Sequence, residues 1–129
     1  MTMNTRPAIT PLRCRSSSDI DLPLLLSLGD RLGPQAATEV VCDRLEQIAL
    51  LLCDIAAVAT APPYGPVAER AQRLSALAAE IGLRELAQIA RHVADCAGRA
   101  DSIALAATRA RLERCFEAVV TSIWDSWPV

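Results

Sequence analysis

The sequence lacks lysine altogether, contains a single histidine, and has few aromatic residues. Its 129 residues are 52 % hydrophobic but only 3 % aromatic, so the core must be built from Ala, Leu, Val and Ile. The absence of lysine excludes every reaction that needs an ε-amine. Alanine has the highest helix propensity and is depleted in strands, so this composition predicts an all-α fold.

The sequence also lacks a strong net charge and a long hydrophobic run. The formal net charge is −2, whereas nucleic acids and anionic membrane surfaces are bound by basic patches. The longest apolar run, residues 48–53, is far shorter than the ~20 residues of a membrane span. We therefore expect no nucleic-acid partner and no membrane partner. Residues 1–18 have no apolar segment typical of a secretory signal, so we expect a disordered tail on a cytoplasmic protein.

Cysteine pairs and common catalytic motifs are missing as well. The five cysteines show no CxxC spacing, which indicates reduced and largely buried thiols. His92 and Cys96 are four residues apart, but a zinc site needs at least three protein ligands and no second such pair exists. No P-loop, GxGxxG or GxSxG is present. We expect no metal, no cofactor and no enzymatic activity.

The hydrophobic residues recur with the period of amphipathic helices in four long segments. These segments are residues 34–59, 66–81, 83–97 and 102–124, with Gly98 able to end the third of them. A shorter segment, residues 22–28, is apolar all round and is expected to lie across the others as a lid. The pattern predicts one domain, residues 19–129, that forms an antiparallel up-down four-helix bundle with a short additional N-terminal helix.

The segment around residues 71–82 has the most informative pattern. An apolar stripe recurs at spacings of three and four and is expected to face the core. It consists of Val67, Ala71, Leu74, Ala78 and Ile81. Gln72, Arg73, Ala76 and Ala79 fall on the outer side, with Glu69 one turn earlier and able to pair with Arg73. This outer face has no nucleophile or base, and it therefore indicates a binding surface.

This segment and the next resemble the histidine phosphotransfer (HPt) domains of bacterial phosphorelays. In that family a His is followed by an aliphatic residue at plus two, Lys at plus three and Gly at plus four. A small residue at plus five or six, Gly at plus ten and Leu at plus fourteen complete the pattern. Counted from Gln72, the matching residues are Leu74, Ala78, Gly82 and Leu86.

The reactive positions of the family pattern differ in this sequence. Gln72 replaces the phospho-accepting His, Ser75 replaces the Lys, and Ala76 replaces the Gly that lets a partner approach. An amide nitrogen is barely nucleophilic, whereas an imidazole can accept a phosphoryl group. The resemblance therefore implies an HPt-like fold without phosphorylation at Gln72.

The resemblance further implies a protein partner, namely a receiver domain or a histidine kinase of a two-component system. The expected partner-binding face comprises Glu69, Gln72, Arg73, Ser75, Ala76 and Ala79. Small side chains allow close approach, and Arg73 can pair with the acidic pocket of a receiver domain. Two alternatives are a structural or oligomerisation bundle, and a phosphocarrier that uses His92, which is expected at the flank or surface of its helix. The sequence does not specify an oligomeric state.

Overall fold

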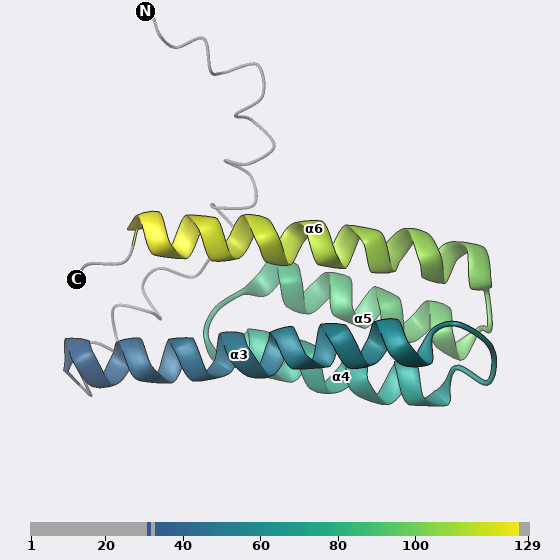
Figure 1. Ribbon diagram of the computed structural model, residues 1–129, viewed down its shortest axis with the longest axis horizontal. Helices are drawn as coiled ribbons and strands as arrows, with labels where there is room; N and C mark the ends of the chain where they lie inside the picture. The colour runs from purple at the N-terminus through teal and green to yellow at the C-terminus, as the bar shows by residue number, and fades with distance from the viewer. Residues whose placement is uncertain (1–30, 32, 127–129) are drawn as a thin grey trace, which may run out of the picture.

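Four α-helices make up the part of the chain that the computed structural model describes, residue 31 and residues 33–126. They are α3 (Pro34–Val58), α4 (Gly65–Glu80), α5 (Arg84–Gly98) and α6 (Ser102–Ser126), with no strand among these residues. Successive helices run in opposite directions and are joined by short turns (Figure 1). The predicted all-α class is confirmed, and the four long segments match the predicted ranges closely. The predicted tail and the predicted helix at residues 22–28 lie outside the described residues.

Proline and aspartate account for the starts of three helices. Pro34 and Pro66 stand in the first turns of α3 and α4, where the missing N–H has no intrahelical partner to lose. Asp101 precedes α6, and its Oδ1 atom accepts a hydrogen bond from the Ala104 backbone N–H at 3.1 Å. This side chain therefore caps one of the otherwise unpaired N–H groups of the helix.

Gly82 ends α4 in a left-handed conformation. Its φ is +79°, a value that glycine adopts without the steric cost of a Cβ. The Gly82 N–H donates to the Ala79 carbonyl at 3.1 Å, and the Leu83 N–H donates to the Ala78 carbonyl at 2.9 Å. These two bonds form a Schellman motif, which turns the chain sharply into α5.

The end of α5 has the same geometry without a glycine. The Ala100 N–H donates to the Ala97 carbonyl at 3.1 Å, and the Asp101 N–H donates to the Cys96 carbonyl at 3.2 Å. Ala100 has a φ of +55°. The helix ends at Gly98 as predicted, but the left-handed position of the turn is occupied by Ala100 two residues later.

The core lies between helices that pack in chain order: α3 on α4, α4 on α5 and α5 on α6. All four helices and the turn after α4 contribute fully buried side chains. The largest are Ile48, Ile55, Leu74, Ile81, Leu83, Leu86, Ile89, Leu105, Leu112, Val41, Val67 and Val93. These residues are aliphatic, as the composition predicts. In α3, Leu51 is buried in this core, whereas Leu52 is only partly buried against it.

The helices differ in length, which leaves one end of the molecule thinner than the other. The outer two, α3 and α6, have 25 residues each, whereas α4 has 16 and α5 has 15. The beginning of α3 and the end of α6 therefore project beyond α4 and α5 on the same side (Figure 1). None of the helices within the described residues is both long enough and apolar enough to cross a membrane.

Candidate docking face on α4

The outer side of α4 presents small and polar residues to solvent. Glu69, Gln72, Arg73, Ala76 and Ala79 are all exposed, because they recur at three- and four-residue spacings opposite the buried stripe. We call these five residues the α4 face. Their exposure is what the periodicity predicts, and neither a nucleophile nor a titratable base other than the Glu69 carboxylate stands among them.

Ser75 is not part of this surface, and its predicted place on the partner-binding face is wrong. Only 6 % of Ser75 is exposed, because it lies one turn from both Ala71 and Ala78, which are buried. Its Oγ donates a hydrogen bond to the Ala87 carbonyl on α5 at 2.9 Å. The hydroxyl therefore links the two helices at a point where both approach closely.

Arg91 extends from α5 toward the same hydroxyl. Its Nη1 atom donates to the Ser75 Oγ at 3.4 Å. Arg91 is itself exposed, so its guanidinium lies at the border between the interior and the solvent. The hydroxyl at position 75 is thus buried and has an arginine from the neighbouring helix beside it.

An open hollow of ≈ 340 Å³ lies between α4 and α5 beside the α4 face. Its lining residues are Gln72 from α4 and Gln88, Arg91, His92, Ala94 and Asp95 from α5. We call it the α4–α5 hollow. It holds a positive and a negative side chain, two amides and the imidazole, so it suits polar groups of a partner more than an apolar ligand.

The hollow brings together two residues that the sequence analysis treated separately. Gln72 stands ten residues before Gly82 and His92 stands ten residues after it. Because α4 and α5 run antiparallel about Gly82, residues equally distant from it come level with each other (Figure 1). That symmetry could have been found in the sequence. His92 is exposed, as predicted.

Arg73 has no ionic partner on its own helix. The ion pairs of the described residues include none between Glu69 and Arg73, so the predicted pair is not formed. A guanidinium that is exposed and has no ionic partner among the described residues can bind a carboxylate from outside with little competition. Arg73 therefore remains the main positive group of the α4 face.

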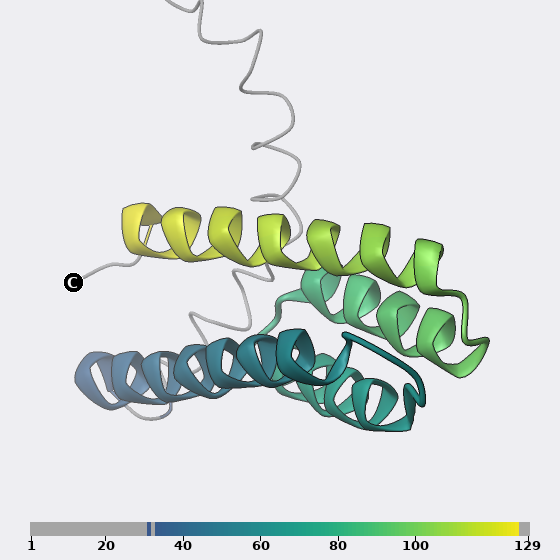
Figure 2. The ribbon, with the colours of Figure 1, turned by 45° about the vertical axis from the view of Figure 1, so that its right-hand side comes forward.

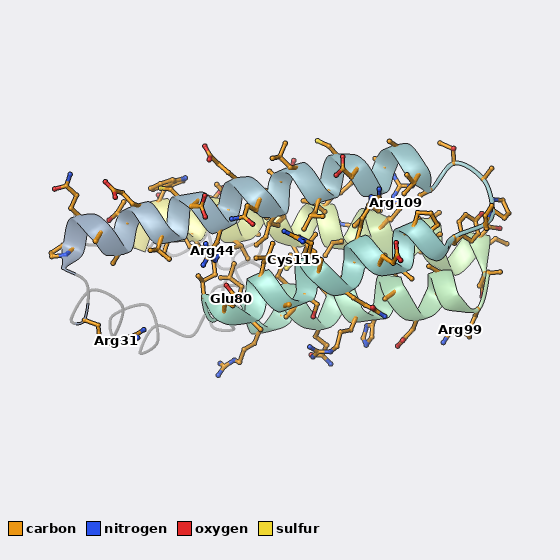
Figure 3. All side chains as sticks on the ribbon, turned by 90° about the horizontal axis from the view of Figure 1, so that it is seen from below. Arg31, Arg44, Glu80, Arg99, Arg109 and Cys115 are labelled. Atoms are coloured by element: carbon orange, nitrogen blue, oxygen red, sulfur yellow. The ribbon has the colours of Figure 1, made fainter. Side chains whose placement is uncertain are left out.

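Arg44 fixes α4 against α3 at the far end of this face. Its Nε donates to the Glu80 Oε1 at 2.8 Å, and its Nη1 donates to the Asp43 Oδ2 at 2.8 Å. In Figure 3 the labelled Arg44 and Glu80 lie side by side between the two helices. The hydrogen bond to Glu80 raises the pKa of the Arg44 guanidinium, so the guanidinium stays protonated in this contact.

The cysteines and the histidine do not assemble into a reactive cluster. His92 is exposed whereas Cys96 is buried, so the two side chains are not both open to a metal ion from solvent. Within residues 33–126, no three His, Cys, Asp or Glu side chains gather where they could hold a metal ion. Cys42, Cys53 and Cys96 are free thiols, and Cys53 is exposed, which corrects the expectation of largely buried thiols.

Comparison of the chain with protein-family models, with curated proteins and with solved structures gives no significant match. Its function must therefore be inferred from its own residues. Those residues place a small, polar, exposed face on α4 next to a polar hollow.

Proposed function

We propose that this protein is a non-catalytic, HPt-like up-down four-helix bundle that binds a receiver domain or a histidine kinase through the α4 face. It would modulate two-component signalling by occupying its partner, without carrying phosphate. The observation that carries the proposal is the exposure of Gln72 beside Arg73, Ala76 and Ala79 on a helix whose opposite side is buried. This is the level at which the resembling family holds its phospho-accepting histidine.

The surroundings of Gln72 support the proposed register. Leu74, Ala78 and Leu86, which match the family pattern, are fully buried. Gly82 matches the glycine at plus ten and has a positive φ. This backbone conformation explains why a glycine suits the position. The residues that match the pattern are thus those on which packing depends. Of the residues that depart from it, Gln72 and Ala76 are exposed and Ser75 is buried.

The chemistry of the α4 face suits binding of a protein partner without phosphoryl transfer. The Gln72 amide can donate and accept hydrogen bonds, but its nitrogen lone pair is delocalised and does not attack phosphorus. Ala76 and Ala79 leave room for a partner's backbone to approach. Arg73 on the face and Arg91 in the hollow supply two positive groups for an acidic pocket.

A second candidate function is phosphoryl transfer through His92. The observation in its favour is that His92 is exposed in the same hollow as Gln72 and Arg91. An exposed imidazole can accept a phosphoryl group, and an adjacent guanidinium can stabilise its charge. Asp95 in the same hollow opposes it, since a carboxylate repels a phosphoryl dianion.

The test is a binding titration against a panel of isolated receiver and histidine-kinase domains. Ala76→Trp places a bulky ring on the α4 face, and we expect it to weaken binding of a recognised domain at least tenfold, or about 1.4 kcal/mol. Arg73→Glu should weaken it comparably because it reverses the charge that meets the acidic pocket.

Two matched substitutions on another helix serve as controls. Ala106 and Arg111 are exposed on α6, so Ala106→Trp and Arg111→Glu repeat the same chemical changes away from the α4 face. We expect both to bind as the unaltered chain does. Equal binding by all four variants would refute the α4 face as the docking surface. Failure of every receiver and kinase domain to bind would instead favour a structural bundle.

A further inference from the structure

The first turns of α3 have no part of α4 beside them. Arg44 is hydrogen-bonded to Glu80, the last residue of α4. Because the two helices are antiparallel, residues 34–43 continue past the end of α4 (Figure 1). At 1.5 Å per residue this projection is about 15 Å long.

The last turns of α6 project in the same direction. α6 follows α5 after a short turn, runs antiparallel to it and is longer by several turns. Its C-terminal part, which includes Val119 and Ile123, therefore extends past the start of α5 toward the beginning of α3 (Figure 2). We call these two projecting parts, residues 34–43 and 117–126, the overhang.

Apolar side chains of the overhang are buried although the two helices do not pack closely together. Ala37 is 0 % exposed and Val41 is 2 % exposed on α3, and Ile123 is 2 % exposed on α6. Yet α3 and α6 are absent from the closely packed pairs of described helices and lie well apart in Figure 2. Two separated helices cannot exclude water from both inner faces by themselves. A further apolar segment must cover them.

We propose that residues 20–28 of the same chain, which include the short helix predicted at residues 22–28, cover the overhang. This segment is mostly apolar, with six aliphatic residues among nine: Ile20, Leu22, Leu24, Leu25, Leu26 and Leu28. Only residues 29–33 separate it from α3. Five residues span at most about 18 Å, which keeps the segment next to the first turns of α3.

The inner lining of the overhang marks where the segment docks. Thr38, Val41 and Cys42 on α3 and Ile123 and Trp124 on α6 line one shallow hollow. Its walls are mostly apolar, and so is the segment. A second copy of the chain would bring apolar surface too, but the tether gives residues 20–28 a local concentration in the millimolar range. The covering segment therefore comes from the same molecule.

Cys42 provides a direct probe of this cover. Its thiol is half-buried in the hollow, whereas Cys53 is exposed farther along the same helix. In the full-length chain we expect iodoacetamide to alkylate Cys42 at least tenfold more slowly than Cys53. Because the chain has no lysine, trypsin cleaves only after arginine, and the two thiols fall in separate peptides, residues 32–44 and 45–70. Mass spectrometry can therefore follow each rate.

The decisive variant places two charges in the proposed cover. Leu25→Asp with Leu26→Asp should release the segment, because a buried carboxylate loses its hydration. We expect Cys42 alkylation to rise about tenfold while Cys53 stays unchanged. Ile9→Asp with Leu12→Asp makes the same change in residues 1–18 and should leave both rates unaltered. Equal Cys42 rates in all three chains would overturn the proposal.

Two further readouts separate the alternatives. Cys96 is buried in the core, so its alkylation reports unfolding of the whole domain. If Cys96 reacts in the Asp variant, the milder substitution Leu25→Ala replaces it as the test. We then expect a smaller rise in the rate of Cys42 alkylation, and an unchanged rate would contradict the proposed cover. Protection of Cys42 that disappears on dilution would show that a second copy covers the overhang, which would also overturn the proposal.

Discussion

Ser75 holds α4 to α5 through a hydroxyl that has no exposure to a partner. It donates to the Ala87 carbonyl at 2.9 Å and accepts from Arg91 at 3.4 Å. The Ala87 carbonyl also accepts a backbone hydrogen bond within α5, so the Ser75 hydroxyl donates a second hydrogen bond to an acceptor that is already paired. A bond of this kind contributes about 1 kcal/mol.

Substitutions at Ser75 should therefore act on stability. We expect Ser75→Ala to lower the free energy of unfolding by about 1 kcal/mol. Ser75→Lys should lower it by more than about 2 kcal/mol, because the ammonium would be buried next to the Arg91 guanidinium. Urea unfolding followed by circular dichroism measures both. Equal stability of the Lys variant and the unaltered chain would mean that position 75 faces solvent after all.

The periodicity predicted the exposure of Gln72 and Arg73 because both lie opposite a clear apolar stripe. Ser75 lies at the edge of that stripe, where the helical period alone does not decide whether a side chain is buried or exposed. Its burial depends on how closely α5 approaches, and that distance follows from the small residues of both helices together. A single-helix pattern does not contain this information.

At the scale of the helices, the two C-terminal turns of α4 and α5 repeat one geometry with different residues. Gly82 takes the left-handed position after α4, with φ +79°, and Ala100 takes it after α5, with φ +55°. An L-residue pays about 1–2 kcal/mol in this conformation, whereas glycine does not. The α5 end is therefore the less stable of the two.

Exchanging these residues should change stability in opposite directions. We expect Ala100→Gly to raise the free energy of unfolding by about 0.5–1 kcal/mol, after the extra freedom of glycine in the unfolded chain is subtracted. Gly82→Ala should lower it by about 1 kcal/mol or more. Gly98→Ala is the control, since Gly98 is helical and has no atom within 4 Å of an added Cβ. It should leave stability unchanged or slightly higher. A loss of stability in Ala100→Gly would contradict the left-handed assignment.

Helix ranges could be predicted from the sequence because proline and glycine stand at their boundaries. The contribution of the loops to the hydrophobic core could not be predicted in this way. Tyr64 falls in the loop before α4, yet it is only 7 % exposed and belongs to the core. The place of Cys53 was also missed: it follows Leu52 on the side of α3 away from α4, where no neighbour covers it.

At the scale of the whole molecule, the proposed docking face for a partner and the proposed cover by residues 20–28 lie in different places. The α4 face lies along the middle of the helix pair α4 and α5, whereas the overhang lies at the end formed by α3 and α6 (Figures 1 and 2). Arg44 and Glu80 mark the boundary between the two regions (Figure 3). A partner on the α4 face would therefore leave the proposed cover in place.

The register of α4 against α5 decides what the α4 face can do. It sets Gln72 level with His92 and puts Arg91 between the hollow and Ser75. The sequence predicted each of these residues on its helix, but their meeting follows from the turn at Gly82. His92 thus places an imidazole, which can accept a phosphoryl group, near the α4 face.

The most direct measurement is a phosphotransfer assay with a receiver domain that binds the chain. The receiver is first labelled with ³²P at its aspartate, mixed with the protein, and the products are separated on a gel with and without acid treatment. We predict that the receiver loses label only at its own hydrolysis rate and that the protein acquires no acid-labile phosphate. Label on the protein that disappears in the His92→Gln variant would contradict this account and establish His92 as a phospho-acceptor.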